Sequence, residues 1–469
     1  MSQVQVSKYV KFIERPNDTV IYHSQIGGAC AIDEKIREIF EKLKDIKVCN
    51  SPQELISKLK FNIDESELEE VFQEFSEKGF LIVDGVDTDY VEKYTNERIQ
   101  NLSTGRQIKT IQLVVSNNCN FKCKYCFENK IYCSEEREKY QHDINNKIMS
   151  SADAIEYIQV VIDTIKKEDA DALHIQFFGG EPLTNKEAII AVLEHFENGK
   201  QYGIDISYSI VTNGSLIDKN IAEYFKRYNV GVVISFDNPK KTDRNMKSGK
   251  NSIEKVIESL EILKSNNNHV AFNSVLSQQT IEYFDTSIID CALEYNVSEV
   301  GIVLDLDPSF YTKDTIEEIS DKLIEVYQYG LEKDIQVSGY WMSTYLASLD
   351  FMAMKKGFKT CSGTGSQFSI EPNGKVFSCK GSSAYFGDIR DIKELLSNET
   401  YQLYAKRSIN NSSKCKACDI EGFCSGFCLG PLEQSFGSAN YVLEEYCELL
   451  KRVTQRLFAI EGDLDYYEL

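Results

Sequence analysis

Six short apolar segments alternate with long amphipathic segments between residues 108 and 306, and this alternation constrains the fold more than any other feature of the sequence. The strand-like segments are IQLVV (111–115), ALHIQFF (172–178), DISYSIV (205–211), VGVVISF (230–236), VAFNSVL (270–276) and EVGIVLDL (299–306). Intervening segments such as residues 253–264 carry apolar residues at helical spacing. Six strand–helix repeats predict an α/β fold with a parallel sheet and right-handed crossovers, either an open doubly wound sheet or an incomplete barrel.

Chemically distinctive residues follow the first three of these strands. Cys119 comes after the first strand, Gly179–Pro182 after the second and Thr212–Gly214 after the third. In both folds the carboxyl ends of the parallel strands meet at one edge of the sheet, and ligands bind there. The sequence therefore predicts a functional site at this edge.

Two regions of different character flank the repeats. The first has strand-like segments at 8–15, 19–24, 29–33 and 80–85 and helical segments at 34–46, from Ser51 and from Asp64, which predicts a winged-helix-like module with an exposed sheet edge. The polar segment Asp87–Gly105 is expected to be a linker.

The last region is rich in Gly and Cys and has few apolar runs, so we expect bound metal to supply much of its folding free energy. The predicted domains are residues 1–92, a linker at 93–106, the repeats at 107–335 and the Cys-rich region at 336–469.

Composition excludes several classes of function. The chain has 469 residues and a formal net charge of −21, which opposes binding to nucleic acid. No segment approaches the roughly 20 apolar residues of a membrane helix, and no secretory signal opens the sequence, so we expect a cytoplasmic protein without a membrane partner. In the cytosol the 14 cysteines do not form a disulfide framework. Three of them lie in residues 119–126 and seven lie after residue 360, a clustering that indicates metal binding or redox chemistry.

The first cysteine cluster has three thiols, one fewer than the usual four-ligand metal site. A cubane [4Fe-4S] cluster bound by Cys119, Cys123 and Cys126 would leave one iron open to an outside molecule. A zinc ion bound by three thiolates and water is the alternative. One strand later, the glycines of Gly179–Pro182 allow a ligand to approach the backbone, and the glutamate of this segment can hold a ligand's ammonium group.

The segments CNFKCKYC and GGEP together resemble the radical S-adenosylmethionine (SAM) superfamily, over about residues 107–335. The resemblance implies a partial (β/α)6 barrel in which Cys119, Cys123 and Cys126 hold a [4Fe-4S] cluster and SAM chelates its open iron. It also implies SAM contacts from Tyr125, beside the adenine, and from Gly179, Gly180, Glu181, Pro182 and Ser235.

The sequence departs from this family after the fourth strand. Asn238 stands where the family usually has glycine, Thr242 where it has histidine, and Met246 falls near an expected arginine. We therefore assign no arginine to the SAM carboxylate and interpret Arg244 and Lys247 only as neighbours.

The cysteines after residue 360 resemble the SPASM domain, which extends radical SAM enzymes that modify peptides. The resemblance implies two auxiliary [4Fe-4S] clusters, one held by Cys415, Cys418, Cys424 and Cys447 and the other by Cys361, Cys379 and Cys428. The second set is one ligand short. Either Cys133 or Cys291 completes it, or one iron is open to a substrate thiolate, and we favour the open site. Cys30 and Cys49 are interpreted as buried hydrophobic residues.

The first module resembles the PqqD-like recognition element of peptide maturases in the order of its elements. The resemblance implies leader-peptide binding by strand addition, with Val20–His23, Ala29–Ile32 and the helix at 65–78 as the groove. The alternative is a structural cap or a dimerisation module.

These resemblances imply a maturase that uses three [4Fe-4S] clusters and an electron donor such as flavodoxin or ferredoxin. We predict that it forms a Cys sulfur-to-carbon thioether in a ribosomally made precursor peptide, as sactipeptide and ranthipeptide maturases do. A carbon–carbon crosslinking maturase and a sulfatase-type protein-aldehyde maturase are the enzymatic alternatives. A peptide-binding iron–sulfur electron carrier is the alternative without turnover.

Overall fold

A computed structural model describes residues 4–45, 65–100, 102–127, 147–168, 170–250, 252–352, 361, 363–407, 413–460 and 464–467 of the chain. Cys49, Cys133 and the helix expected from Ser51 lie outside these residues. No helix in the described part of the chain is long and apolar enough to cross a membrane.

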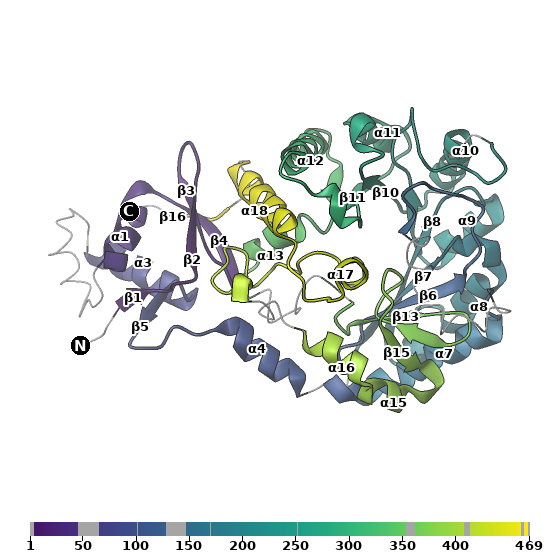
Figure 1. The fold of residues 1–469 in the computed structure, drawn as a ribbon, viewed down its shortest axis with the longest axis horizontal. Helices are drawn as coiled ribbons and strands as arrows, with labels where there is room; N and C mark the ends of the chain where they lie inside the picture. Colours follow the sequence, from purple (N-terminus) through teal and green to yellow (C-terminus); the bar gives the residue numbers. More distant parts are fainter. Residues whose placement is uncertain are drawn as a thin grey trace.

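A largely parallel sheet forms the middle of the larger part of the molecule, on the right in Figure 1, and it contains all six strands that the sequence predicts. They are β6 (Thr110–Ser116), β7 (Ala172–Gly179), β8 (Asp205–Thr212), β9 (Gly231–Ser235), β10 (Val270–Leu276) and β11 (Glu299–Leu304). The helices between them are α7 (Ser151–Ile165), α8 (Lys186–Phe196), α9 (Lys219–Arg227), α10 (Ser252–Ser265) and α11 (Ser287–Glu294), followed by α12 (Thr315–Glu332). Neighbouring strands pair in sequence order and in parallel, as in a partial barrel.

The amino-acid sequence sets the starts of these helices and the burial of their inner faces. The side chains of Ser150, Asn185 and Asp218 cap α7, α8 and α9 by accepting hydrogen bonds from backbone N–H groups of the first turn. The inner faces of these helices and the alternate residues of β6–β11 form one continuous apolar core. This packing holds the carboxyl ends of the strands at one edge of the sheet.

The sheet continues past the predicted boundary at residue 335 and into the Cys-rich region. Strand β12 (Gln336–Ser338) pairs in parallel with β11, and β13 (Gln367–Ile370) pairs in parallel with β6 at the other end. Strands β14 (Lys375–Phe377) and β15 (Tyr385–Asp388) then add in antiparallel order, which gives a ten-stranded sheet. Phe368, Phe386 and Tyr401 join the core of the barrel. The Cys-rich region is therefore built onto the barrel and shares its apolar core.

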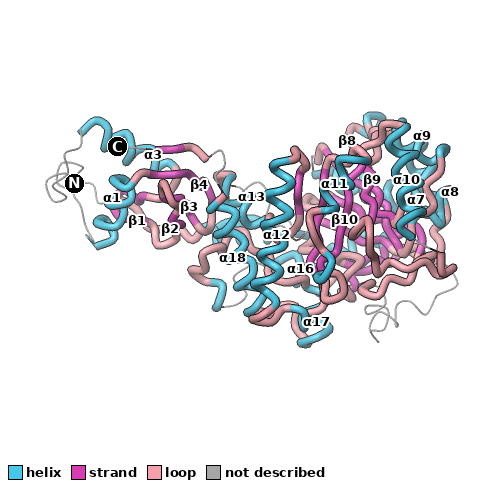
Figure 2. Tube along the Cα trace, turned by 90° about the horizontal axis from the view of Figure 1, so that it is seen from above, coloured by secondary structure: helices cyan, strands magenta, loops and turns pink. Residues whose placement is uncertain are grey.

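The N-terminal module has the predicted strands β2 (Val10–Glu14), β3 (Thr19–His23) and β4 (Gly27–Ile32), and a short pair, β1 (Val4–Val6) with β5 (Leu81–Val83). Helices α1 (Glu34–Asp45) and α3 (Glu65–Glu77) pack on one face of the sheet. On its other face Val20 and Tyr22 pack with Phe458 of α18 (Glu444–Ala459), beside α13 (Ser343–Leu349) (Figure 2). Strand β3 is buried on both faces as a result.

Two features of this module were not expected from the sequence. The segment expected to be a linker contains helix α4 (Tyr90–Ile99), which buries Val91 and Tyr94. One edge of the sheet is covered, because β16 (Tyr466–Tyr467), from the far end of the sequence, lies parallel to β4; among the described strands, β2 keeps an edge without a partner strand. Only tertiary contacts between the two ends of the chain produce this pairing, so no local pattern predicts it.

The C-terminal region holds three further helices, α15 (Ile392–Ser397), α16 (Glu399–Lys406) and α17 (Leu429–Phe436). Its loop at Gly422 docks on the N-terminal module, because the Gly422 N–H donates to the Ser24 carbonyl at 2.8 Å. A Cβ atom at Gly422 would lie 2.2 Å from the Gln25 carbonyl oxygen. Only glycine permits this approach, and the contact fixes the N-terminal module against the Cys-rich region.

The buried His23 makes the N-terminal module sensitive to acid. Its Nδ1 accepts a hydrogen bond from the Gln25 N–H at 3.2 Å, and its Nε2 lies 3.3 Å from the Ser7 hydroxyl oxygen, which fits a neutral ring. Burial lowers the pKa of His23 to about 3 from its ordinary 6.5. Below pH 6.5 the unfolded chain therefore gains a proton at this ring that the folded chain does not take up.

We expect the free energy of unfolding to fall as pH falls from 6.5 towards 3, with about 1.4 kcal/mol lost at pH 5.5 through this ring. A His23→Gln variant lacks the titrating group, so its stability should depend less steeply on pH over that window. Chemical denaturation at pH 5.5 and 7.5 measures the difference, and His195→Gln at an exposed histidine is the control. Equal pH slopes for His23→Gln and the original chain would contradict the assignment.

Candidate active site

The loop that carries Cys119, Cys123 and Cys126 is anchored by backbone hydrogen bonds from the GGE segment. The Gly180 N–H donates to the Ser116 carbonyl at 2.9 Å, and the Glu181 N–H donates to the Asn118 carbonyl at 2.8 Å. Gly179 has a φ of +148°, and a Cβ atom there would lie 2.0 Å from the Ser116 carbonyl oxygen. The glycines thus let the end of β7 approach the start of the cysteine loop, in addition to any ligand.

The Glu181 carboxylate ties the ends of β7 and β8 together. One oxygen accepts from the Leu183 N–H at 3.0 Å and from the Thr212 hydroxyl at 2.6 Å, and the other accepts from the Asn213 N–H at 2.7 Å. Burial raises the pKa of Glu181 to about 7, and these hydrogen bonds oppose the rise. Both oxygens already accept hydrogen bonds from groups of the chain itself, so this side chain stabilises the rim of the cavity by joining the ends of two strands.

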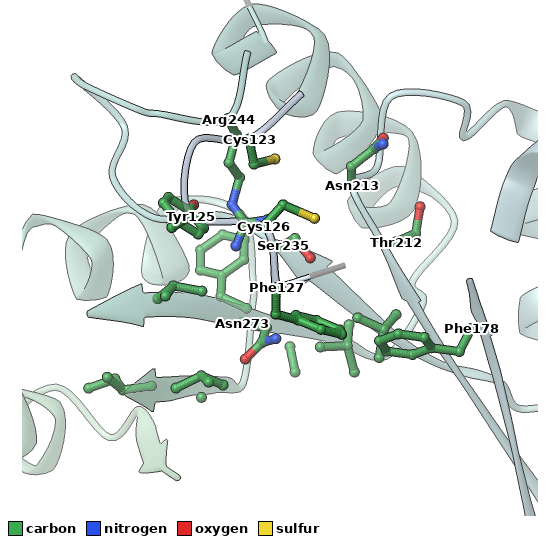
Figure 3. Close-up of a pocket in the computed structure, with 18 of the residues that line it drawn as sticks. Cys123, Tyr125, Cys126, Phe127, Phe178, Thr212, Asn213, Ser235, Arg244 and Asn273 are labelled. Carbon is green, nitrogen blue, oxygen red and sulfur yellow. The ribbon is translucent and has the colours of Figure 1, made fainter. Parts of the chain in front are cut away.

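The segment after β9 pairs with the cysteine loop and brings an arginine into the site. The Lys122 N–H donates to the Asn245 carbonyl at 2.8 Å, and the Lys247 N–H donates to the Asn120 carbonyl at 2.9 Å. The Lys124 N–H also donates to the Asp243 carbonyl at 3.3 Å, so Arg244 lies between two paired residues and beside the cysteines rather than on the outer surface (Figure 3).

Arg244 forms a buried ion pair with Asp237. Its Nε lies 3.1 Å and 3.2 Å from the two carboxylate oxygens, and its guanidinium carbon lies 5.3 Å from the centre of the Tyr125 ring. The Tyr125 hydroxyl donates a hydrogen bond to the same carboxylate. Asp237 and Arg244 were not predicted as site residues. The sequence offered one signal for Arg244, because the family's arginine is expected near Met246 and Arg244 lies two residues before it.

A cavity of about 840 Å³ opens at the carboxyl ends of the strands, where the sequence predicted a site. The predicted residues that line it are Cys119, Cys123, Tyr125, Cys126, Gly179, Gly180, Glu181 and Ser235. Figure 3 shows the Cys123 and Cys126 sulfurs near Arg244, with Ser235 beside Cys126. Pro182 does not line the cavity; it is buried at the start of the short helix whose N-cap is Glu181.

The seven cysteines after residue 360 line two further cavities, and each cavity holds one of the two sets that the resemblance implies. Cys361, Cys379 and Cys428 line a cavity of about 330 Å³. Cys415, Cys418, Cys424 and Cys447 line one of about 370 Å³. The segment Ser425–Phe427 borders both of them.

The first two cavities share a wall. Residues that line both are Gln112, Phe127, Gln176, Phe178, Val303, Leu304, Asp305, Leu306, Tyr340 and Ser343. Half of these residues are apolar, and two of them, Phe127 and Phe178, lie side by side (Figure 3). A molecule in the first cavity can therefore extend towards Cys361, Cys379 and Cys428.

The thiol sets suit a polynuclear cluster better than a single ion. Among the described residues, no three Cys, His, Asp or Glu side chains converge closely enough to hold one metal ion. A cubane spreads its ligands over separate irons, which fits sulfurs placed around a cavity. Burial raises the pKa of Cys123 to about 11 and that of Cys447 to about 12, so metal binding at these sites must displace protons.

Cys30, which the sequence interpretation placed in a core, fits that role; Cys49, interpreted in the same way, lies outside the described residues. Cys30 on β4 is fully buried in the N-terminal core, and Cys291 on α11 is buried in the barrel core. Cys291 does not line the cavity of Cys361, Cys379 and Cys428, so it is not placed to complete that set.

A parallel barrel with three thiols at the carboxyl ends of its strands, followed by a Cys-rich extension of the same sheet, defines a radical SAM enzyme with auxiliary iron–sulfur sites. A model of the radical SAM superfamily matches residues 113–289, and a model of the SPASM iron–sulfur cluster-binding domain matches residues 361–419. These domains imply SAM and iron–sulfur clusters as cofactors. The chain belongs to the radical SAM superfamily and carries a SPASM domain.

Three known proteins show the range of the similarity. A radical SAM cyclopropyl synthase, TigE from Paramaledivibacter caminithermalis, is 46% identical over 469 residues, covering 100% of this chain and 98% of the relative. A cysteine-type anaerobic sulfatase-maturating enzyme from Clostridium perfringens is 24% identical and covers 74% of this chain and 97% of its own. The solved structure of Streptococcus suis SuiB bound to precursor peptide SuiA has a TM-score of 0.54 at 15% identity and covers 95% of this chain and 100% of SuiB.

We expect Arg244→Gln to weaken SAM binding at least tenfold, because it removes the cation that balances Asp237 and holds the Tyr125 ring. Equilibrium dialysis with labelled SAM on the cluster-loaded enzyme measures the dissociation constant. Lys247→Gln, at an exposed lysine in the same segment, is the matched control and should bind SAM normally. An Arg244→Gln enzyme that keeps its clusters and binds SAM as the original chain does would contradict the assignment.

Proposed function

We propose that this chain is a peptide maturase that removes two hydrogens from one residue of a ribosomally made precursor peptide and closes a cyclopropane ring. The apolar part of the wall shared by the first two cavities carries the proposal, because Phe127, Phe178 and Leu306 suit a hydrocarbon side chain beside the radical-generating site. Full-length identity of 46% to a cyclopropyl synthase supports the same product class. A cavity of about 840 Å³ has room for both a cofactor and a peptide side chain.

The residues around the first cavity would hold the cofactors. We assign Cys119, Cys123 and Cys126 as the cluster ligands, and Tyr125, Ser235 and Arg244, which line this cavity, as SAM contacts. When bound, SAM and the three proposed clusters supply a 5′-deoxyadenosyl radical and an electron acceptor. The protein's own contribution is to hold the peptide side chain against the shared wall and to exclude water from it.

Ring closure also needs a proton acceptor. One hydrogen atom leaves the first carbon to give 5′-deoxyadenosine, and the second leaves the other carbon as a proton and an electron while the carbon–carbon bond forms. Asp305 follows β11, is buried and lines both cavities, and one oxygen of its carboxylate accepts a hydrogen bond from the Asp307 N–H at 3.0 Å. We infer that Asp305 takes the proton.

Thioether formation, which the sequence predicted, remains the second candidate. It is favoured by the three-thiol set of Cys361, Cys379 and Cys428 in a cavity that adjoins the first. A substrate thiolate on an open iron there would lie near a carbon radical at the shared wall. Cyclopropane closure and thioether formation both remove two hydrogens from the peptide. Only thioether formation consumes the thiol of a substrate cysteine.

We infer that the N-terminal module binds the leader of the precursor. SuiB, solved with its precursor peptide, matches 95% of this chain, whereas the sulfatase-maturating relative matches 74%. Separating leader recognition from chemistry lets one active site act on peptides whose modified region varies.

The function is tested by anaerobic incubation of the cluster-loaded enzyme with SAM, a reductant and the product of a short open reading frame beside its gene. We expect 5′-deoxyadenosine and a peptide lighter by two hydrogens. Tandem mass spectrometry should place the loss in one aliphatic residue, and cysteine should stay open to alkylation. Cysteine protected from alkylation would replace the ring by a thioether, and an aldehyde would indicate sulfatase-type chemistry. No 5′-deoxyadenosine with any peptide would exclude a maturase.

We expect Asp305→Asn to lower the rate of product formation by about 100-fold or more, because general base catalysis contributes that much. Formation of 5′-deoxyadenosine should continue, since the substitution leaves the first cavity's thiols in place. Asp307→Asn, two residues away and outside both cavities, is the matched control. Equal product rates for the two variants would exclude Asp305 as the proton acceptor.

A further inference from the structure

The outer edge of β4 is occupied by a segment from the other end of the sequence. Residues Tyr466 and Tyr467 lie opposite Ala31 and Ile32 in a parallel ladder. The Ala31 N–H donates to the Asp465 carbonyl at 2.8 Å, and the Asp33 N–H donates to the Tyr467 carbonyl at 3.0 Å. Figure 1 shows β16 within the N-terminal module, beside β4 and far along the sequence from it. We call Leu464–Tyr467 the tail strand.

The tail strand is held by side chains on both faces of the sheet. Tyr467 packs on Phe75 of α3, with ring centres 5.5 Å apart, and its hydroxyl donates to Glu74 Oε1 at 3.0 Å. Lys78 Nζ donates to the same hydroxyl at 2.9 Å. On the opposite face Leu464 packs with the apolar residues around Val20. Tyr466 is 52% exposed.

These contacts define a groove between β4 and α3 with a specific chemistry. The β4 backbone offers N–H groups at Ala31 and Asp33, which any extended peptide can use. The pocket at Phe75 takes an aromatic ring, and Glu74 and Lys78 at its mouth take a hydroxyl group. The site near Val20 takes an aliphatic side chain three residues earlier. The tail strand fits all three features, so the groove is a built peptide-binding site with an internal occupant.

We propose that this groove binds an extended segment of the precursor peptide with an aliphatic-x-x-aromatic pattern, and that the tail strand is an internal competitor which this segment must displace. The proposal rests on the proposed function, that the chain acts on a precursor peptide. The incoming segment runs parallel to β4, takes the N–H groups of Ala31 and Asp33, and places its aromatic ring on Phe75.

Tethering determines how strongly the tail strand competes. A segment linked to its own site has an effective concentration in the millimolar range, so it excludes free peptides of similar affinity. The apparent dissociation constant of a free peptide rises by the inverse of the fraction of chains whose groove is open. A groove that is occupied nine times in ten weakens binding about tenfold. Only a precursor with further contacts to the enzyme then displaces the tail strand.

The direct test uses a fluorescent synthetic peptide of residues 464–469, LDYYEL, as the probe. Its binding is measured by anisotropy, up to millimolar enzyme, on the full chain and on a variant lacking residues 464–469. We expect the deletion variant to bind the peptide at least tenfold more tightly than the full chain does. Equal affinity, or no binding to a deletion variant that keeps its clusters, would overturn the proposal.

A matched pair of tyrosines shows whether the groove selects its ligand. In the probe peptide, the change corresponding to Tyr467→Ala should weaken binding to the deletion variant at least tenfold, because it removes the ring on Phe75 and the hydroxyl between Glu74 and Lys78. The change corresponding to Tyr466→Ala removes an exposed ring and should have little effect. Similar losses for both peptides would mean that binding is not at this groove.

Hydrogen exchange shows whether the probe peptide takes the place of the tail strand on β4, without an activity measurement. The Ala31 and Asp33 amides should exchange faster in the deletion variant and regain protection when the probe peptide is added. Unchanged exchange in the deletion variant would exclude the tail strand as their partner. This outcome is independent of catalysis: if the groove tests fail while the precursor still loses two hydrogens, only the tail-strand proposal falls. If the groove tests succeed and no precursor is modified, only the proposed function falls.

Discussion

The close backbone contact between the end of β7 and the start of the cysteine loop is the constraint on which the site depends. The loop contributes few apolar residues to the core, so its position comes from hydrogen bonds to neighbouring elements. Gly180 and Glu181 donate to it from β7, and Asn213 donates through its side-chain amide to Asn120 from the end of β8. The segment around Arg244 pairs with its other side. Because these partners come from three strand ends, the three thiols keep their relative positions only when those strands are packed side by side in the sheet.

This arrangement explains which parts of the site could be predicted from the sequence. The six strands and their helices follow from local periodicity, and the two C-terminal thiol sets follow from cysteine spacing together with a family resemblance. Arg244 and Asp305 were missed for a different reason. Arg244 reaches the cavity through a ladder between two segments about 120 residues apart, and Asp305 was read as part of a strand that in fact ends at Leu304. The same limit applies to β16, which pairs with β4 across almost the whole sequence. Such contacts are decided by tertiary packing, so no local window contains them.

The shared sheet has a consequence for chemistry. Since β13 pairs with β6, the Cys-rich region cannot move independently of the strand that leads into the cysteine loop. Lys380 reinforces this link, because its backbone N–H donates to the Gln112 side chain at 2.8 Å and its ammonium group donates to Asn117 at 2.7 Å. The first two cavities are therefore held at a fixed separation with a common wall. A fixed separation suits a reaction in which a carbon radical must meet one partner and no other, because a reactive intermediate that can reorient also reacts elsewhere.

The N-terminal module gains its place in the molecule through the same C-terminal region. Its sheet has α1 and α3 on one face and α13 and α18 on the other, and the turn at Gln25 contacts Gly422 between the cysteines of the third cavity. A peptide that replaces the tail strand on β4 thus binds to a strand whose preceding turn contacts the loop of the third cavity's cysteines. Leader binding and the auxiliary sites are then connected through packed side chains rather than through a flexible linker. The helix α4, which fills the predicted linker, is consistent with this rigid connection, since a helix holds its ends at a fixed distance where an extended polar segment would not.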